Sequence, residues 1–349
     1  MKKKDEKNFK IAGDIAAQMK YGQQPHLSNL KRKMEKLEKI DLELTNYCNL
    51  ECKHCYMNAN QIEKGNKLSF EKAIQIIQEF SEIGGRRIAL TGGEPLLHDK
   101  FLEIFNFIVD NGIKIELETN GFFLNKNLVK NLSKHRENIR YVQISLDGPE
   151  KIHDMIRGLK GSFKRAINAI ELCLKEEINV RVSTVLIKQN KDSIFEIFEI
   201  LKKLSVTDFR VDAGVPTGRG RNVAISVNEY INVVKKLNEL MGNDNNGKVI
   251  TPSCGVGETR VAVTVNGAIL PCPMIRDLIA GNAFNYGELS VALNSEAIKK
   301  VRDGLENSCG NCKSRKICGR GCKARAYAIT KNLNSPDIFR CALFKKRKE

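Results

Sequence analysis

The sequence predicts an α/β fold in which a parallel sheet curves into a partial (β/α)6 barrel and is followed by a cysteine-rich C-terminal domain. Six short apolar, β-branched runs alternate with segments of 3.6-residue periodicity, the pattern of buried parallel strands and their crossover helices. All of the 11 cysteines except Cys173 fall in two clusters, and the second cluster lies beyond the last strand–helix pair. In such a sheet, with right-handed crossovers, the chemistry sits at the carboxyl ends of the strands.

The elements of the barrel begin at residue 39. The expected strands occupy 39–45 (KIDLELT), 86–91, 114–119, 139–146, 179–187 and 208–213. The expected helices occupy 69–83, 99–111, 125–133, 162–177 and 191–204. Ser69 and Ser162 are the expected N-caps, and Gly84-Gly85 and Gly112 are expected to end helices. Cys173 lies on the apolar stripe of its helix, which favours core packing.

The β/α alternation stops near Pro216. A bridging helix over 227–241 leads through the loop Gly242–Gly247 into a different region from about 252. There, RVAVTV–NG–AILPC predicts a β-hairpin with Asn266-Gly267 as its two-residue turn. The chain therefore divides into a basic, short helical lead-in at 1–38, the barrel at 39–220, the bridging helix and linker at 221–252, and the cysteine-rich domain at 253–349.

Composition limits the compartment and the partners. The chain has no apolar run near the ~18 residues of a membrane span, and no apolar stretch follows its charged N-terminus. We therefore expect a cytoplasmic protein without membrane attachment, in which reduced thiols serve metal or redox chemistry. The net charge of +17 indicates either solvated lysine-rich faces or an acidic partner, but aromatics are only 6%, so nucleic acid is disfavoured.

The first cysteine cluster consists of Cys48, Cys52 and Cys55, immediately after the first expected strand. A disulfide framework needs an even number of cysteines, and a closed zinc site needs four ligands. The spacing Cys-x3-Cys-x2-Cys suits three thiolates around one face of a cubic iron–sulfur cluster, whose fourth iron then lacks a protein ligand. An open zinc site would normally include histidine or carboxylate, and His54 cannot easily reach the same metal from within so short a loop.

This motif after the first strand of a β/α barrel resembles that of the radical S-adenosylmethionine (SAM) superfamily, which has a partial TIM-like barrel. Two further motifs match in order. They are Leu90-Thr91-Gly92-Gly93-Glu94-Pro95 after the second strand, and Ser145-Leu146-Asp147-Gly148 after the fourth, with His153-Asp154-Met155-Ile156-Arg157-Gly158 beyond it. In that family the open iron of a 4Fe–4S cluster binds the methionine part of SAM. Reductive cleavage then releases a 5′-deoxyadenosyl radical that abstracts a substrate hydrogen.

The resemblance implies that five residues bind SAM. Gly93 and Glu94 would bind the methionine amino group, and Arg157 would bind the carboxylate. Ser145 would lie on the ribose side, and His54 beside the adenine. The three cysteines of the first cluster would hold the 4Fe–4S cluster, and a flavodoxin or ferredoxin would supply the electron. A Gly-Gly-Glu-Pro turn by itself is most often an ordinary turn, so the order of the motifs carries the resemblance.

The second cysteine cluster contains seven cysteines. It starts with Cys254 and Cys272, continues through the run Cys309-x2-Cys312-x5-Cys318-x3-Cys322 and ends at Cys341. Cysteine pairs of this kind are also common zinc ligands, but one zinc site would leave three of these thiols unused. The layout resembles the SPASM extension of radical SAM enzymes, which binds two auxiliary 4Fe–4S clusters, so three clusters are expected in total. The resemblance assigns auxiliary cluster I to Cys254, Cys272 and Cys322, and auxiliary cluster II to Cys309, Cys312, Cys318 and Cys341.

The resemblance leaves the substrate open. Sulfatase-maturing relatives carry an aspartate after the second auxiliary cysteine, and Pro273 in that position disfavours their activity. The preferred hypothesis is modification of a ribosomally made peptide by a thioether link, a carbon–carbon crosslink or epimerisation. The alternative is modification of a haem-precursor tetrapyrrole, since 216–221 and 322–328 resemble that branch, although peptide maturases share similar stretches. A non-catalytic iron–sulfur electron carrier would leave the SAM motifs without a purpose.

Two observations bear on how a substrate is recognised. Residues 1–38 are too short for the N-terminal recognition domain that many peptide maturases carry, so a separate peptide-recognition protein is a further expected partner. Haem precursors carry carboxylates and many precursor peptides have acidic leaders. Arg219 and Arg221, after the sixth expected strand, would face the mouth of the barrel and clamp a substrate carboxylate. The alternative is that both arginines are solvated loop residues.

Overall fold

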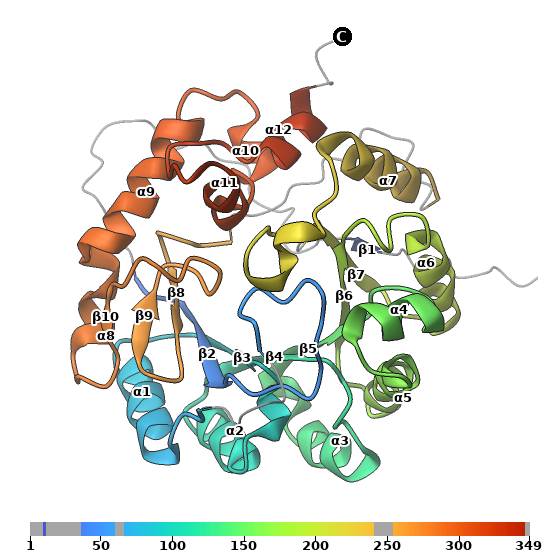
Figure 1. Cartoon of the computed structure of the whole chain (residues 1–349). Helices are drawn as coiled ribbons and strands as arrows, with labels where there is room; N and C mark the ends of the chain where they lie inside the picture. The colour runs from blue at the N-terminus through green and yellow to red at the C-terminus, as the bar shows by residue number, and fades with distance from the viewer. Residues whose placement is uncertain (1–9, 12–35, 60–65, 241–253, 346–349) are drawn as a thin grey trace, which may run out of the picture.

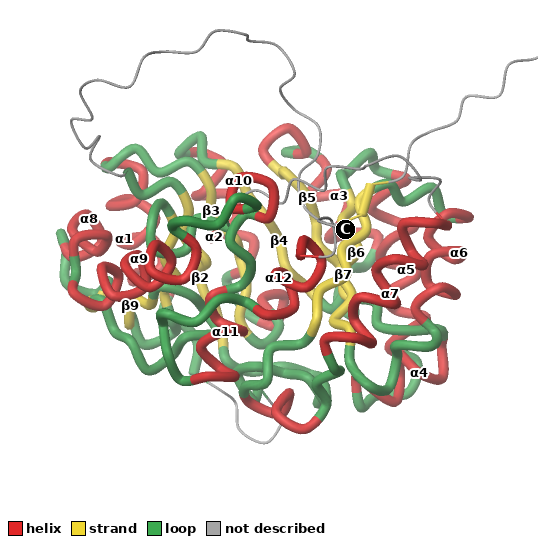
Figure 2. The backbone as a smooth tube through the Cα atoms, turned by 90° about the horizontal axis from the view of Figure 1, so that it is seen from above, coloured by secondary structure: helices red, strands yellow, loops and turns green. Residues whose placement is uncertain are grey.

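The computed structural model describes residues 10–11, 36–59, 66–240 and 254–345. Six parallel strands form a partial barrel and neighbour one another in chain order, which confirms the predicted fold class. They are β2 (Lys39–Thr45), β3 (Arg87–Gly92), β4 (Lys114–Thr119), β5 (Ile139–Ser145), β6 (Val180–Leu186) and β7 (Asp208–Ala213). In Figure 2 the strands lie in the interior of the molecule and the helices lie at its periphery.

Five helices follow the strands and cover the outside of the barrel (Figure 1). They are α1 (Phe70–Glu82), α2 (Phe101–Asp110), α3 (Lys126–Ser133), α5 (Ser162–Lys175) and α6 (Ile194–Lys203). Ser69 caps α1 as predicted, because its side chain accepts a hydrogen bond from the Lys72 N–H. The predicted cap at Ser162 is wrong: Gly161 is the N-cap of α5, and the Ser162 hydroxyl donates instead to Asp154, 2.9 Å away.

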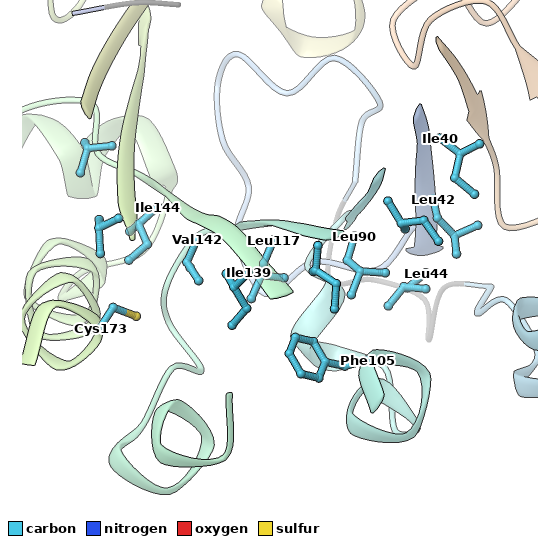
Figure 3. Close-up of a cluster of buried hydrophobic side chains, with 14 of the residues drawn as sticks. Ile40, Leu42, Leu44, Leu90, Phe105, Leu117, Ile139, Val142, Ile144 and Cys173 are labelled. Atoms are coloured by element: carbon cyan, nitrogen blue, oxygen red, sulfur yellow. The ribbon is translucent and has the colours of Figure 1, made fainter. Parts of the chain in front are cut away.

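The apolar core of the barrel is the layer between its strands and helices (Figure 3). On β2, Ile40, Leu42 and Leu44 are fully buried members of this layer, and so is Cys173 on α5, as its position predicted. The alternate residues of β2 are charged and also buried: Lys39, Asp41 and Glu43. Because side chains alternate across a strand, these charges face the interior of the barrel. The inside of this barrel is therefore polar, unlike the packed interior of a closed (β/α)8 barrel.

The C-terminal region joins the same sheet, which the sequence did not predict. Its strands are β8 (Arg260–Val263), β9 (Ala268–Leu270) and β10 (Gly281–Asn282), and β8 pairs in parallel with β2. The predicted bridging helix is α7 (Val227–Leu240). The helices of the C-terminal region are α8 (Glu288–Val291), α9 (Glu296–Cys309), α10 (Arg315–Cys318), α11 (Lys323–Thr330) and α12 (Ile338–Lys345). Short 3-10 turns complete the chain: η1 (Pro95–Leu97), η2 (Arg136–Asn138), η3 (Gly218–Asn222) and η4 (Ala292–Asn294).

The β8–β9 hairpin forms where it was predicted, but its turn is longer. The Thr264 N–H donates to the Ala268 carbonyl at 3.0 Å, and the Gly267 N–H donates to the Thr264 carbonyl at 2.9 Å. Three residues therefore make the loop, and Gly267, with φ of +81°, takes its left-handed position. A two-residue turn of the Asn-Gly type needs positive φ at both residues, whereas Asn266 is not among the described residues with positive φ.

Two of the predicted segments lie mostly or wholly outside the described residues. Of the lead-in 1–38, only 10–11 and 36–38 are described, and β1 (Lys10–Ile11) is a strand that pairs in parallel with β7. The rest of the predicted helical lead-in and the loop Gly242–Gly247 fall among the residues not described. Within the described ranges no helix is long and apolar enough to cross a membrane.

Candidate active site

A cavity of about 600 Å³ occupies the interior of the barrel and extends to the C-terminal region. Cysteines of both clusters line it: Cys48, Cys52, Cys55, Cys254, Cys272, Cys318 and Cys322. The first three belong to the loop that follows β2, which crosses the middle of the ring of strands next to η3 (Figure 1). The carboxyl ends of the strands therefore carry the chemistry-bearing residues, as in other β/α folds.

The cysteine loop is held from one side by α4 (Glu150–Arg157), a helix that the sequence did not predict. The Glu51 N–H donates to the Arg157 carbonyl at 3.1 Å, and the Lys53 N–H donates to the Ile156 carbonyl at 2.9 Å. Gly158 ends this helix with φ of +72°, and a Cβ there would meet the Glu51 carbonyl oxygen at 3.2 Å. The end of α4 thus packs directly on the loop backbone.

Arg219 on η3 holds the same loop from the other side. Its guanidinium donates to the carbonyls of Cys52 (2.8 Å) and Ala59 (2.7 Å), and its own N–H donates to the Cys55 carbonyl at 2.9 Å. Arg221 is exposed and does not line the cavity. Arg219 therefore braces the cysteine loop and Arg221 is exposed, and the carboxylate clamp stays a prediction.

The glycine turn after β3 makes a close contact with the start of the cysteine loop. A Cβ on Gly92 would lie 2.2 Å from the Thr45 carbonyl oxygen, and one on Gly93 would lie 2.1 Å from the Tyr47 carbonyl oxygen. The Gly93 N–H also donates to the Thr45 carbonyl at 2.7 Å. The absence of a side chain at both positions is needed for this backbone contact, whereas we had expected glycine there to admit a ligand. Both glycines line the cavity.

Glu94 connects the glycine turn to the end of β4. Its carboxylate is 1% exposed and accepts hydrogen bonds from Thr119 Oγ1 (2.6 Å), the Asn120 N–H (2.8 Å) and the Leu96 N–H (3.2 Å). Burial raises the pKa of Glu94 to about 7, although these donors oppose the rise. Glu94 is not among the residues that line the cavity, so the geometry makes its carboxylate an organiser of two loops.

Asp147, just after β5, connects two of the predicted SAM-binding residues. Its Oδ2 lies 2.7 Å from Arg157 Nη2 and 3.6 Å from His54 Nε2. Burial lowers the pKa of His54 to about 4, although the nearby Asp147 carboxylate opposes this shift. Ser145, at the end of β5, lines the cavity beside this group. Sequence reasoning treated Asp147 only as part of a motif, and its one signal was an acidic residue directly after a buried strand.

The cysteines predicted for auxiliary cluster I lie near one another. Burial is the main cause that raises the pKa of Cys272 to about 12 and that of Cys322 to about 11, and the neighbouring thiols of this set raise both further. The set predicted for auxiliary cluster II gathers Cys309, Cys312 and Cys318, whose charges interact. Its fourth member, Cys341, lies on α12, which packs against α10.

The predicted donor sets consist of free cysteines, whose thiolates suit iron–sulfur clusters. Donors also reach the first set: the Leu50 N–H lies 3.4 Å from Cys48 Sγ, and Asn120 Nδ2 lies 3.9 Å from it.

Sequence reasoning also missed the charged residues of the barrel interior. Asp41 pairs with Arg260 of β8, and Glu43 pairs with Arg276, so two arginines of the C-terminal region bind successive inward residues of β2. The available signal was the alternation of charged and apolar residues in KIDLELT. We had counted that run as a strand buried on both faces, where continuous apolar residues are the norm.

Comparisons with known proteins match the two halves of the chain. The model of the radical SAM superfamily matches residues 42–204, and the model of the SPASM iron-sulfur cluster-binding domain matches residues 254–314. The AdoMet-dependent heme synthase of Methanosarcina barkeri is 29% identical over 326 residues, which cover 83% of this chain and 92% of that protein. The mycofactocin maturase MftC of Mycolicibacterium smegmatis is 26% identical over 320 residues, which cover 84% and 80% of the two chains.

Solved structures share the fold. SuiB of Streptococcus suis bound to S-adenosylmethionine superimposes with a TM-score of 0.70 at 18% identity, covering 88% of this chain and 78% of that chain. The enzyme anSMEcpe with bound AdoMet and the Cp18Cys peptide superimposes with a TM-score of 0.71 at 20% identity, covering 88% and 94%. At these identities the match concerns the fold, and it agrees with the predicted barrel and C-terminal domain.

Proposed function

Because this chain is an enzyme with a radical SAM domain and a C-terminal SPASM domain, we propose that it reductively cleaves SAM and uses the resulting 5′-deoxyadenosyl radical to abstract hydrogen from a substrate in the barrel cavity. One observation carries the proposal: the three cysteines after β2 and four cysteines of the C-terminal region, Cys254, Cys272, Cys318 and Cys322, line the same cavity. A substrate in that cavity would lie between the site of radical formation and the auxiliary site.

Three 4Fe–4S clusters are part of this proposal. The one held by Cys48, Cys52 and Cys55 would supply the electron that cleaves SAM. The auxiliary clusters would be held by two cysteine sets, namely Cys254, Cys272 and Cys322, and Cys309, Cys312, Cys318 and Cys341. Gly93, His54 and Ser145 line the cavity and would contact SAM, while Glu94 would keep the glycine turn in place. A flavodoxin or ferredoxin would be the electron donor.

The proposed substrate is a ribosomally made peptide. Relatives named as maturases support it, and a solved neighbour with the same fold is SuiB bound to its precursor peptide SuiA. A haem-precursor tetrapyrrole is the second candidate, supported by the relatives named AdoMet-dependent heme synthase. One observation favours it: the cavity lining is rich in arginine, a residue that attracts carboxylates, although several of these arginines are already paired with carboxylates of the chain. The arginines of the lining are Arg87, Arg140, Arg157, Arg181, Arg210, Arg219, Arg260, Arg325 and Arg340.

The first experiment tests metal content and SAM cleavage. Anaerobically reconstituted protein should hold about twelve irons, four for each cluster. A variant with Cys48, Cys52 and Cys55 all changed to alanine should lose about four of these irons and all formation of 5′-deoxyadenosine. Zinc in place of iron, or cleavage retained in that variant, would refute the proposal.

The second experiment separates the two substrates. The wild-type protein, SAM and a reductant are incubated either with a short peptide encoded beside the gene or with an iron-bound tetracarboxylate haem precursor. The proposed peptide activity predicts a mass change in the peptide, in step with 5′-deoxyadenosine. A mass change in the tetrapyrrole alone would instead select the second candidate.

A further inference from the structure

The carboxylate of Glu118 lines the cavity without a partner from the described chain. Glu118 lies near the carboxyl end of β4, on the same face as Glu116, because side chains alternate along a strand. Its side chain is half-buried and makes no hydrogen bond or ion pair with a described residue. The other two carboxylates of the lining differ from it, since Glu116 is held by three donors and Asp212 is exposed. Glu118 is therefore the enclosed carboxylate that remains open to a ligand.

A second polar group lines the same cavity without a partner. Tyr56 follows Cys55 on the cysteine loop, and its hydroxyl makes no hydrogen bond with another described residue. The Tyr56 side chain lies within electrostatic range of Glu118. Burial raises the pKa of Glu118, although the Lys39 ammonium opposes this shift, so a hydrogen-bond donor from a ligand would stabilise the carboxylate.

The two groups together offer one acceptor and one donor beside the cysteine loop. A peptide unit presents the complementary pair, because its N–H donates and its carbonyl accepts. An iron-bound haem precursor presents carboxylates, which only accept, and its ring nitrogens are occupied by the iron. A carboxylate placed beside Glu118 would in addition meet a like charge.

The arginines of the lining do not reverse this preference, because the chain already pairs several of them with its own carboxylates. These ion pairs are Arg140–Glu116, Arg260–Asp41 and Arg325–Asp337. A ligand with four carboxylates would have to compete with these pairs for the guanidinium groups.

We propose that Glu118 and Tyr56 form a substrate-binding subsite beside the cysteine loop, and that the group they bind is a peptide unit of the substrate. Glu118 accepts a hydrogen bond from an N–H of the peptide, and the Tyr56 hydroxyl donates to a carbonyl. The inference rests on the proposed function and narrows its substrate to the peptide. Because Tyr56 directly follows Cys55, a peptide residue bound here lies next to the place where the radical forms, which positions its target carbon.

The test measures binding and coupling in Glu118→Ala, Glu118→Gln, Tyr56→Phe and Asp212→Ala. Asp212 lines the same cavity from β7, so its variant controls for the loss of one carboxylate from the lining. The probes are the short peptide encoded beside the gene and an iron-bound tetracarboxylate haem precursor. Dissociation constants are measured anaerobically on the cluster-loaded protein with SAM but without a reductant, so that no turnover occurs. The second readout is the amount of 5′-deoxyadenosine formed per modified peptide after a reductant is added.

We expect Glu118→Ala to weaken peptide binding about tenfold, the scale of one charge-assisted hydrogen bond. Glu118→Gln keeps an acceptor oxygen and Tyr56→Phe loses a neutral donor, so each should weaken peptide binding only about threefold. All three variants should form more 5′-deoxyadenosine per modified peptide, because the target carbon is held less well. Glu118→Ala should bind the haem precursor as tightly as the wild type or more tightly, and Asp212→Ala should match the wild type with both probes. If Glu118→Ala does not load iron, Glu118→Gln and Tyr56→Phe decide by the same criteria.

Three outcomes would overturn the inference. One is peptide binding in the Glu118 and Tyr56 variants equal to that of Asp212→Ala. Another is an equal loss of affinity for both probes, which would show that the subsite does not select a peptide. The third is a wild-type protein that binds the haem precursor and not the peptide. Failure of the proposed function looks different, because the wild-type protein would then form no 5′-deoxyadenosine with either probe.

Discussion

The barrel and the C-terminal region share one apolar cluster but differ in the charged side chains that they bury. The barrel is organised around a continuous apolar layer that includes Phe80, Phe105 and Phe209, all nearly or fully buried. In the C-terminal region some of the most buried side chains are cations: Lys323 is 4% exposed and Arg325 is 2% exposed. A buried cation is tolerated only when its donors are satisfied, so this region depends on a few specific polar contacts.

Those contacts connect segments that are distant in the sequence. Lys323 Nζ donates to the carbonyls of Gly304 (3.0 Å) and Leu333 (2.8 Å), which ties α9 to the segment after α11. Arg325 donates to both oxygens of Asp337, at 3.0 and 2.6 Å, and to the Ala213 carbonyl at the end of β7. The difference teaches that both regions share one apolar cluster, and that the C-terminal region adds buried cations fixed by backbone carbonyls and by Asp337.

The largest difference between the two regions should appear when iron is removed from the protein. Cluster binding stabilises a small metal-binding region directly, so stripping iron with a chelator should expose the backbone amides of α9, α11 and α12 to hydrogen exchange. The amides of β2 to β7 should stay protected. Hydrogen-exchange mass spectrometry of holo- and apo-protein makes the measurement. The control is the variant lacking Cys48, Cys52 and Cys55, in which α9 to α12 should keep their protection. Equal loss of protection in both regions would show that the comparison is wrong.

The second prediction concerns the charged interior of the barrel. Glu116 is bound by Lys39 (2.5 Å), Arg140 (2.6 Å) and Tyr141 (2.7 Å). Burial alone would raise the pKa of Glu116, but Lys39 and the other donors lower it to about 2. Glu116→Gln should reduce the free energy of unfolding by about 3–5 kcal/mol, the usual cost of leaving a buried partner unpaired. Urea denaturation of the apo-protein, followed by circular dichroism, makes the measurement.

The pH dependence sharpens this prediction. Because the folded pKa lies below the unfolded value near 4.5, the stabilisation from Glu116 is complete above that value and is lost as the pH falls toward 2. The matched control is Glu118→Gln. Glu118 lies two residues further along β4 and lines the same cavity, but its side chain makes no hydrogen bond or ion pair with a described residue, and burial raises its pKa. That variant should be as stable as the wild type or slightly more stable at neutral pH, because it removes a carboxylate whose ionised form burial disfavours. A loss equal to that of Glu116→Gln would contradict the assignment.

The smallest effect is expected in the cysteine loop that follows β2. Arg219→Gln removes two hydrogen bonds to loop carbonyls, at Cys52 and Ala59. At about 1 kcal/mol per lost bond, iron should leave the first cluster about 30-fold faster during chelation. Arg221→Gln, two residues away and exposed, serves as the control and should match the wild type. The measurement is the rate of iron release by absorbance. Equal rates of iron release in the two variants would show that Arg219 does not stabilise the cysteine loop.

The sequence allowed individual strands and helices to be predicted, because each depends on a short local pattern. The strand 39–45 and the strand 208–213 match β2 and β7 residue for residue, because an apolar, β-branched run between turn residues carries its own signal. Contacts between distant residues carried no such signal. The pairing of β8 with β2 brings distant positions together, and the ion pair between Arg260 and Asp41 alone joins residues that are 219 apart. The helix α4 was also missed, since it is short and its buried residues include His153 and Arg157.

The same limit applies to the site. The motifs identified cysteines and glycines because their spacing is strict. They could not indicate that Arg157 is paired with Asp147, or that Arg219 is committed to the loop backbone. Both facts depend on how α4 and η3 pack against the cysteine loop, and packing is a property of the folded chain rather than of any segment.

The parallel pairing of β2 with β8 also bears on how the protein is synthesised. One edge of β2 stays unpaired until the ribosome has synthesised its partner strand β8, about 219 residues later. At roughly 5–20 residues per second this interval lasts on the order of 10–40 s. Throughout it, the nascent barrel presents an unpaired strand edge beside buried charges whose partners, Arg260 and Arg276, do not yet exist. Chains released before residue 260 should therefore aggregate or remain bound to chaperones, even though they contain every strand of the barrel.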